Sequence, residues 1–424
     1  MEELLHRYGD PFTVRLATSP PLVITTDPDT IRGIFTAGGE VLHAGAAGAR
    51  VLSPLVGDHS VLVLDGAEHM RQRRLMLPSF HGARMKAYAV AMRDTATRAF
   101  RALPAGKPLP IHPVMQSITL EVIVRTVFGV EDATRMKRLG DQLTRILDMG
   151  SRPSIMAALV PTMMFGRGRK FLRERTRADD MIFDEIQRRR ETGDFADRTD
   201  VLSLLMCAVD DDGQGMTEQE LRDELVTILA AGHETSATSL AWTVERVLSH
   251  ERVYEALRAE VDRELGDEPI TDESLARLEY LDATVRESLR LKPIIPMVVR
   301  KLAVPMTIRG FDLPAGCIVA PNIYLTHRRP DVYPDPDAFR PERFVGSKPN
   351  PYAWLPFGGG IRRCLGMAFA LYEMKIVLAT LLQEANLVLH AKSSARTVRR
   401  AITFAPSGGV QVVIKPRRPL RAVA

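Results

Sequence analysis

The residues with the clearest chemical potential surround Cys364, in the run Phe357-Gly358-Gly359-Gly360-Ile361-Arg362-Arg363-Cys364-Leu365-Gly366. Three consecutive glycines let the chain turn tightly and lie close to a flat ligand. A helix predicted over 364–386 would place the thiol at its N-terminus, where backbone N–H groups and the helix dipole favour the thiolate. Arg362 and Arg363 add positive charge, and Gly366 permits close packing beside the sulfur. Such a thiolate suits an axial ligand of haem iron, although each feature taken singly also fits a buried cysteine after an ordinary turn.

A second candidate is Ala231-Gly232-His233-Glu234-Thr235, inside a long helix predicted over 217–249. Helix interiors at core depth rarely keep a carboxylate. A Thr hydroxyl can bond to the carbonyl four residues earlier, which bends or opens the helix and leaves room for dioxygen and a water. The alternative is a solvent-facing acid on an ordinary helix. Zinc is rejected, because His-Glu-x-x-His would need a second histidine where Ala237 stands.

The loop around Cys364 resembles the cysteine-ligand loop of the cytochrome P450 family, with the pattern Phe-x-x-Gly-x-Arg-x-Cys-x-Gly. The resemblance spans nearly the whole chain. It implies haem b with an axial thiolate from Cys364, and O₂ as co-substrate. It also implies that Thr235 stabilises the oxygen species on the iron and that Glu234 relays protons to it.

The resemblance implies two further groups of residues. A structural triad behind the cysteine loop would join Glu287 and Arg290, three apart on one helix face, to Arg343 in Pro341-Glu342-Arg343-Phe344. Buried haem propionates need cationic or donor partners. The expected cofactor-binding residues are His69, Arg73, Arg300, Phe357, Arg362 and Gly366. The alternative for the early basic residues, Arg71 and Arg74 included, is a solvated helix face or a docking surface.

The substrate pocket is expected to be apolar, as ligand sites generally are. Its predicted walls are residues 44–66, 154–165, 229–235, 294–298 and 405–407, and its named pocket residues are Ala231, Met297, Val298 and Pro406. Met163 and Met164 suggest an adaptable wall. Because these segments offer no fixed charge for a carboxylate, we expect a bulky neutral substrate such as a terpenoid, steroid, fatty acyl chain or macrolide.

The predicted function is therefore a haem-thiolate monooxygenase that hydroxylates or epoxidises this substrate. Electrons would come from a ferredoxin or flavodoxin with its NAD(P)H reductase, since the chain has neither a flavin domain nor an iron–sulfur cysteine set. Arg71, Arg74 and Arg363 are candidate docking residues for such an acidic partner. The alternatives are a haem-thiolate peroxygenase, isomerase or coupling oxidase, and a haem sensor without catalysis.

The elements that must position these residues are mostly helical. Apolar positions recur near a 3.6-residue period in 84–102, 114–128, 133–148, 168–191, 200–209, 217–249, 251–264 and 279–291. Short strands are predicted at 12–25 around Pro20-Pro21, and at 298–303, 305–308, 317–321, 401–404 and 410–415, with a helix opening at Pro28 after Asp27. Residues 44–66 are interpreted as a long loop.

The fold class predicted is mainly α with small β-sheets (α+β), as one haem-binding domain over 1–424. Its expected parts are a β-rich lobe of about 1–66 and 296–325, a helical core of about 67–291, and the cysteine loop 357–366.

Composition is consistent with this class. The 424 residues are 45% hydrophobic and 26% charged, as in globular proteins, and a net charge of +5 is too small to indicate nucleic acid. Three cysteines make no disulfide framework, and Cys207 and Cys317 lie in apolar runs expected in the core. Neither a secretory signal nor a run of about 18 apolar residues is found, so we expect a cytoplasmic monomer without a membrane anchor in this chain.

Overall fold

The computed structural model describes residues 1–15, 19–82, 84–130, 132–150, 167–390, 395–400 and 403–415. Helices dominate it. The α-helices are α1 (Glu2–Tyr8), α2 (Pro28–Thr36), α3 (Gly45–Val56), α4 (Gly66–Met76), α5 (Arg84–Arg101), α6 (Ile111–Thr126), α7 (Ala133–Gly150), α9 (Arg167–Thr192), α10 (Val201–Cys207), α11 (Glu218–Leu248), α12 (Glu251–Glu264), α13 (Asp272–Arg277), α14 (Glu279–Leu291), α15 (Ile323–Thr326) and α16 (Met367–Glu384). Short 3₁₀ turns include η3 (Pro341–Arg343) and η4 (Gly360–Arg362).

The strands form small sheets at the periphery of the helical body. The strands are β1 (Phe12–Val14), β2 (Leu22–Thr25), β3 (Leu42–His43), β4 (Pro108–Pro110), β5 (Arg300–Leu302), β6 (Met306–Ile308), β7 (Phe311–Leu313), β8 (Ile318–Pro321), β9 (Asn386–Leu389), β10 (Thr397–Arg400), β11 (Thr403–Pro406) and β12 (Gln411–Lys415). The largest sheet has the order β1-β2-β8-β5-β3, and β2 pairs with β8 in parallel. The others are β4-β12-β9 and the hairpins β6-β7 and β10-β11.

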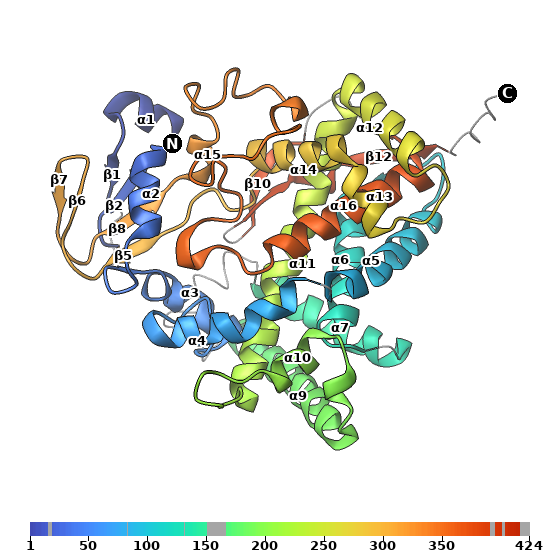
Figure 1. Cartoon of the computed structure of the whole chain (residues 1–424), viewed down its shortest axis with the longest axis horizontal. Helices are drawn as coiled ribbons and strands as arrows, with labels where there is room; N and C mark the ends of the chain where they lie inside the picture. The colour runs from blue at the N-terminus through green and yellow to red at the C-terminus, as the bar shows by residue number, and fades with distance from the viewer. Residues whose placement is uncertain are drawn as a thin grey trace.

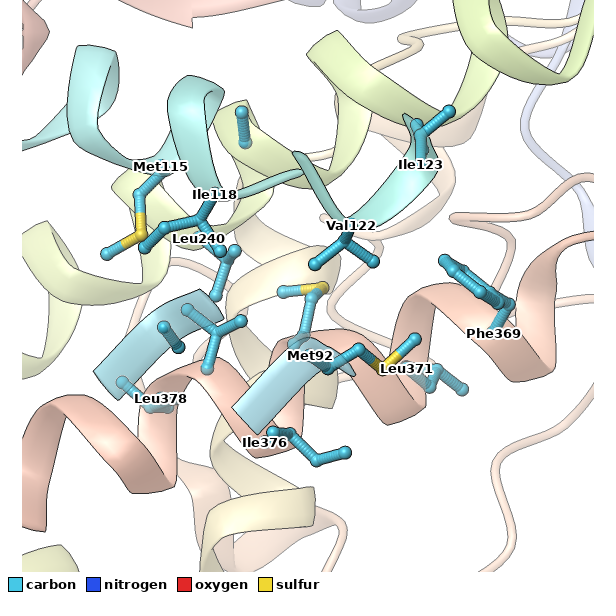
Figure 2. Packing of buried hydrophobic residues seen from close by; sticks show 14 of the residues in the cluster. Met92, Met115, Ile118, Val122, Ile123, Leu240, Phe369, Leu371, Ile376 and Leu378 are labelled. Carbon is cyan, nitrogen blue, oxygen red and sulfur yellow. The ribbon is translucent and has the colours of Figure 1, made fainter. Parts of the chain in front are cut away.

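Figure 1 shows the five-stranded sheet with α1 and α2 on one side of the molecule and the helices on the other. α11 runs through the centre and packs against α6, α14 and α16. The main core lies between these helices and α5, where Met92, Ile118, Val122 and Leu378 are buried and their side chains converge (Figure 2). The loop that carries Cys364 leads into α16, so this core supports it from behind (Figure 1).

Long periodic segments were predicted well. Each of the eight expected helices is present, and their ends agree with the prediction to within a few residues. The caps are those the sequence suggests: Asp27 accepts the N–H of Thr30, and Thr217 forms a capping box with Glu220. The hairpin β1-β2 around Pro20-Pro21 is confirmed.

Residues 44–66, predicted to be a loop, instead contain the helix α3. Its Gly- and Ala-rich sequence has little periodicity, and Pro54 lies inside it. The helix is stabilised from outside, because Asp65 accepts the N–H groups of Ala44, Gly45 and Ala46 at its first turn. Such a distant cap leaves no signal in the local sequence. The short strands β3, β4, β7, β9 and β10 were also missed, because two- to four-residue strands carry too few positions to establish a period.

Two predictions about cysteines are wrong. Cys207 is exposed at the last residue of α10, where the apolar face of the helix no longer turns inward. Cys364 does not begin a helix, since α16 starts three residues later with Gly366 as its N-cap. Cys317 is buried, as expected.

Candidate active site

The glycines before Cys364 are required by a neighbouring helix. A Cβ on Gly359 would lie 2.2 Å from the ring of Phe35, and a Cβ on Gly360 would lie 2.2 Å from the Phe35 carbonyl oxygen. Gly360 also has a φ of +66°, which L side chains rarely adopt. The sequence suggested that these glycines let the loop lie close to a flat ligand. In the structure, Gly359 and Gly360 let the loop lie close to α2. The loop closes through a bond from the Cys364 N–H to the Phe357 carbonyl at 3.0 Å.

The Cys364 thiol is solvent-accessible, yet it lies inside the protein. Burial raises the pKa of the thiol. The N–H of Gly366 and the charges of Arg73 and Arg363 lower this pKa, but they offset the effect of burial only in part. This direction is opposite to the one expected from a helix N-terminus, because the burial of the thiol outweighs the N–H of Gly366, the N-cap of α16. An accessible sulfur with a desolvated environment faces an internal space, which is where a ligand for that sulfur would lie.

Four basic side chains gather close to Cys364, and we call them the His69 cluster: His69, Arg73, Arg300 and Arg362. His69 is buried, and within the described residues its Nδ1 has no hydrogen-bond partner. Burial and the neighbouring arginines lower its pKa to about 4. Burial and Arg362 likewise lower the pKa of Arg300 to about 10. Burial is the first cause of both shifts, and it leaves His69 neutral at pH 7, so the positive charge of the cluster lies on its three arginines.

The carboxylate that the described chain supplies to this cluster is Asp65, 2.5 Å from Nη2 of Arg362. Arg362 also donates to the carbonyls of Val61 and Leu64. Arg73 donates to the carbonyl of Arg363 at 2.8 Å, and Arg300 donates to that of Val299 at 2.9 Å. Arg73 and Arg300 thus bond to neutral carbonyls. An orphaned buried imidazole nitrogen and excess positive charge fit a ligand with two carboxylates, as haem has.

The α11 segment carries Thr235 at a position where the helix is accessible. Thr235 Oγ1 donates to the Ala231 carbonyl at 2.5 Å, as expected. The helix remains α-helical from Glu218 to Leu248, so this bond does not open it. Ala231 is exposed although the helix is otherwise largely buried, which indicates that this face borders an internal space. Ser236, the next residue, bonds to the buried Glu373 of α16, which ties this part of α11 to the helix after the cysteine loop.

Glu234 points away from Thr235, into a polar network that the sequence did not reveal. Its Oε1 accepts from Nη1 of Arg400 at 2.9 Å, and its Oε2 accepts from Nε2 of Gln116 at 2.6 Å. His112 Nε2 lies 3.6 Å from the same carboxylate. Burial, followed by the charge of Arg400, lowers the pKa of His112 to about 4, so this imidazole is neutral. α6 and β10 supply these partners, and no spacing in the sequence links them to α11.

Glu287, Arg290 and Arg343 come together, and we call them the Glu287 cluster. Glu287 and Arg290 are fully buried and form a forked pair, with Nε to Oε2 at 2.7 Å and Nη2 to Oε1 at 2.8 Å. Arg290 also donates to the carbonyls of His327 and Pro336, both at 2.7 Å. Arg343 Nε lies 3.4 Å from Glu287 Oε1 as an ion pair. This arrangement was expected from the resemblance. Arg343 completes it through Nη2, which donates to the carbonyl of Asp335 at 2.7 Å, whereas its Nε makes no hydrogen bond among the described residues.

The predicted pocket residues are placed unequally. Val298 lies close to the cysteine loop, because a Cβ on Gly358 would be 3.9 Å from its Cγ1. Met297 packs instead against the cluster of Phe12 and Ile24 in the sheet lobe, and Pro406 is buried in β11. Residues 154–165, with Met163 and Met164, lie outside the described residues.

The docking candidates differ in their surroundings. Arg71 is partly exposed and already paired, since it bonds to Asp210 at 2.6 Å and to Glu220 at 2.7 Å. Arg74 is exposed and lies 3.1 Å from the exposed Asp211, and Arg363 is exposed. Arg71 and Arg74 border a groove of about 800 Å³ that is also lined by Ile361, Met70 and the acidic turn Asp210, Asp211 and Asp212. The acidic turn therefore neutralises much of the basic face expected from the sequence.

Comparison with known proteins identifies the class. The sequence profile of the family described as Cytochrome P450 matches residues 1–409. A putative cytochrome P450 135B1 of Mycobacterium tuberculosis (strain ATCC 25618 / H37Rv) is 38% identical over 421 residues, which cover 99% of this chain and 87% of that protein. A putative cytochrome P450 137 of the same strain is 34% identical over 421 residues, with 99% and 86% covered.

Solved structures agree. Retinoic acid bound cyanobacterial CYP120A1 superposes with a TM-score of 0.88 at 25% identity, and the match covers 98% of this chain and 94% of that one. The haem domain of cytochrome P450DA superposes with a TM-score of 0.85 at 24% identity, which is a likeness of fold.

The fold and these matches define a haem-dependent oxidoreductase that uses dioxygen. The chain belongs to the cytochrome P450 family, a class of monooxygenases whose haem is held by a cysteine thiolate. The predicted fold class is thereby confirmed. In the described part of the chain, no helix is long and apolar enough to cross a bilayer, and no group of three or more His, Cys, Asp or Glu side chains is placed to hold a metal ion.

Proposed function

We propose that Cys364 is the axial thiolate ligand of the haem, that the His69 cluster binds its propionates, and that the enzyme oxidises a bulky apolar substrate. The observation that carries this proposal is the set of three arginines that share one carboxylate, together with a buried imidazole nitrogen that has no partner among the described residues, beside the accessible thiol of Cys364. Phe357 and Gly366 complete the haem contacts on the cysteine side. The Glu287 cluster fixes the chain behind the loop and takes no part in the chemistry.

When bound, the haem supplies the activation of dioxygen with two electrons and two protons. The residues of this chain orient the cofactor and manage protons. His69, Arg73, Arg300 and Arg362 hold the propionates and so fix the plane of the ring. Thr235 Oγ1 lies on the accessible face of α11 and can pass its bond from the Ala231 carbonyl to a ligand on that face. The Glu234 carboxylate, one residue before Thr235, serves as the proton relay. Arg400 and Gln116 donate to this carboxylate and set its orientation.

The proposed substrate is a bulky, mostly apolar molecule of the terpenoid, steroid, fatty acyl or macrolide kind. Ala231 and Val298 are the described pocket residues that support this, together with α3 as a wall. CYP120A1 was solved with retinoic acid bound, which is largely apolar but, unlike the substrate proposed here, carries a carboxylate. The proposed electron donor is a ferredoxin or flavodoxin with its reductase that docks on the cysteine-loop side. Arg363 and Arg74 remain its candidate contacts, and Arg363→Glu should slow reduction without loss of haem.

The carbon monoxide difference spectrum of the reduced protein tests the ligand. We expect a thiolate-type Soret band in the wild type and its loss in Cys364→Ala. Cys207→Ala, at an exposed helix end, is the matched control and should keep the band. A histidine-type band in the wild type, or a thiolate band that survives in Cys364→Ala, would overturn the proposal.

A second assay separates a monooxygenase from a peroxygenase, an isomerase or an oxidase. The protein is supplied with a surrogate ferredoxin and reductase and with candidate apolar substrates, and NAD(P)H consumption is compared with product that has gained one oxygen atom from ¹⁸O₂. Equal amounts support the proposal. Product formed only with peroxide, or without incorporated oxygen, contradicts it.

A further inference from the structure

The carboxylate of Asp65 contacts two parts of the molecule that are far apart in the sequence. Its Oδ1 accepts the N–H groups of Ala44 and Gly45, both at 2.9 Å, and its Oδ2 accepts that of Ala46 at 2.7 Å. The same Oδ1 lies 2.5 Å from Nη2 of Arg362. One side chain therefore holds both the first turn of α3 and a guanidinium two residues before Cys364.

α3 depends on this outside contact for its first turn. Its N-cap residue is Ala44, which has no polar side-chain atom, and the helix contains Gly48 and Pro54, which lower intrinsic helix stability. A Cβ on Gly45 would lie 2.3 Å from the carbonyl oxygen of Val63. The first turn therefore packs directly on the segment that leads to Asp65.

Arg362 fixes the same segment from the other side. It donates to the carbonyls of Val61 and Leu64 and pairs with Asp65, so residues 61–65 are bound to it at three points. Burial lowers the pKa values of His69 and Arg300, and the charge of Asp65 opposes that shift in both. A fixed position of Arg362 therefore helps to fix the first turn of α3, and the reverse also holds, because both bond to Asp65.

We propose that Asp65 is a positioning residue that couples α3, a wall of the substrate pocket, to the residues that hold the haem. The part that concerns haem rests on the proposed function. A substrate that orders the first turn of α3 strengthens the hold on Arg362, and a cofactor that orders Arg362 stabilises α3. Such coupling is reciprocal, because a shared contact links both sites with one free energy.

Hydrogen exchange read by mass spectrometry on the full-length, haem-loaded protein tests the coupling without measuring turnover. In Asp65→Ala we expect the amides at the start of α3 to exchange about tenfold faster, because three N–H groups lose their acceptor. Asp65→Asn should give a smaller increase, since its amide oxygen still accepts. The exposed Glu68 offers a matched control, and Glu68→Gln should leave these amides unchanged. Equal exchange in Asp65→Ala and Glu68→Gln would overturn the proposal.

Arg362→Gln distinguishes coupling from simple capping, because Arg362 bonds to Val61, Leu64 and Asp65 rather than to α3. We expect the amides of residues 44–46 to exchange about two- to fivefold faster in this variant, with those of α12 unchanged. In Asp65→Ala/Arg362→Gln the exchange should match that of Asp65→Ala alone. Unchanged α3 amides in Arg362→Gln, or effects that add in the double variant, contradict the coupling.

Two iron-binding probes test whether α3 is a wall of the pocket. Imidazole is small, and clotrimazole is bulky enough to reach the pocket walls. Asp65→Ala should weaken clotrimazole binding about fivefold or more and change imidazole binding less than about twofold. Equal changes would show that Asp65 acts on the haem alone. The carbon monoxide spectrum of each sample reports on the proposed function separately, since a chain without a thiolate band can still show coupled exchange between Arg362 and α3.

Discussion

The two clusters of basic side chains beside the cysteine loop are built in opposite ways. In the Glu287 cluster, Glu287 and Arg290 are fully buried, and the carbonyls of His327, Pro336 and Ala338 take the remaining donors of Arg290. In the His69 cluster, three arginines share one carboxylate, and the Nδ1 of the neutral His69 lacks a partner among the described residues.

This difference separates a structural role from a binding role. A buried charge that its own chain satisfies costs little to keep and stabilises one arrangement of the backbone. A buried charge left short of anions destabilises the chain until a ligand supplies them. The same residue type, arginine, therefore has opposite consequences for folding in two places of one fold.

Breaking the Glu287 cluster should have the largest effect. Glu287→Gln removes the charge that Arg290 is bound to and leaves a buried guanidinium uncompensated, which should cost about 3–5 kcal/mol of unfolding free energy. Urea unfolding with haem retention measures it, and Glu255→Gln, an exposed acid on α12, is the control. A loss below about 1 kcal/mol would mean that the cluster is not structural.

Removing a charge from the His69 cluster should act with the opposite sign on the haem-free chain. Arg300→Leu relieves an uncompensated burial, so the free energy of unfolding without haem should stay level or rise, whereas haem affinity should fall about 10- to 100-fold. Haem transfer to apomyoglobin gives the affinity. With haem dimethyl ester, whose propionates are neutral, the variant and the wild type should differ far less. An equal loss with both haems contradicts propionate binding by Arg300.

Glu373 differs from both clusters, because it is a buried carboxyl group whose hydrogen-bond partner, Ser236, carries no charge. Burial raises its pKa from 4.5 to about 8, although Ser236 donates to it. Because the folded pKa is above the unfolded one, stability is full below about pH 4.5 and falls as pH rises toward 8. Glu373→Gln should remove that slope and gain on the order of a few kcal/mol near pH 8. Unfolding measured from pH 5 to 9 decides this, and an unchanged slope would contradict it.

The smallest effect is expected at the exposed pair of Arg74 and Asp211. Arg74→Gln should change the free energy of unfolding by less than about 0.5 kcal/mol, since both side chains are hydrated. Arg71→Gln, three residues earlier on the same helix, should cost more, about 1 kcal/mol, because Arg71 bonds to two carboxylates that are only partly exposed. Thermal unfolding of the two variants compares them, and equal shifts would refute the distinction.

The sequence predicted the elements whose evidence is local. Eight helices, the caps at Asp27 and Thr217, and the loop motif around Cys364 follow from periodicity, capping chemistry and spacing within a few residues. It failed where the stabilising partner is remote. α3 was missed because its cap is Asp65, and the pKa of Cys364 is raised rather than lowered because folding buries the thiol.

The sequence by itself determined the family, the fold class and the residue types at the site, because these depend on motifs and on periods that repeat along the chain. Tertiary structure alone decided which charges are satisfied. Folding pairs Glu234 with Arg400 and Arg71 with Asp210. It also brings Asp65 into contact with both Arg362 and the first turn of α3. The physical reason is that a charge is compensated by whatever folding brings within about 4 Å, and that distance is independent of separation along the chain.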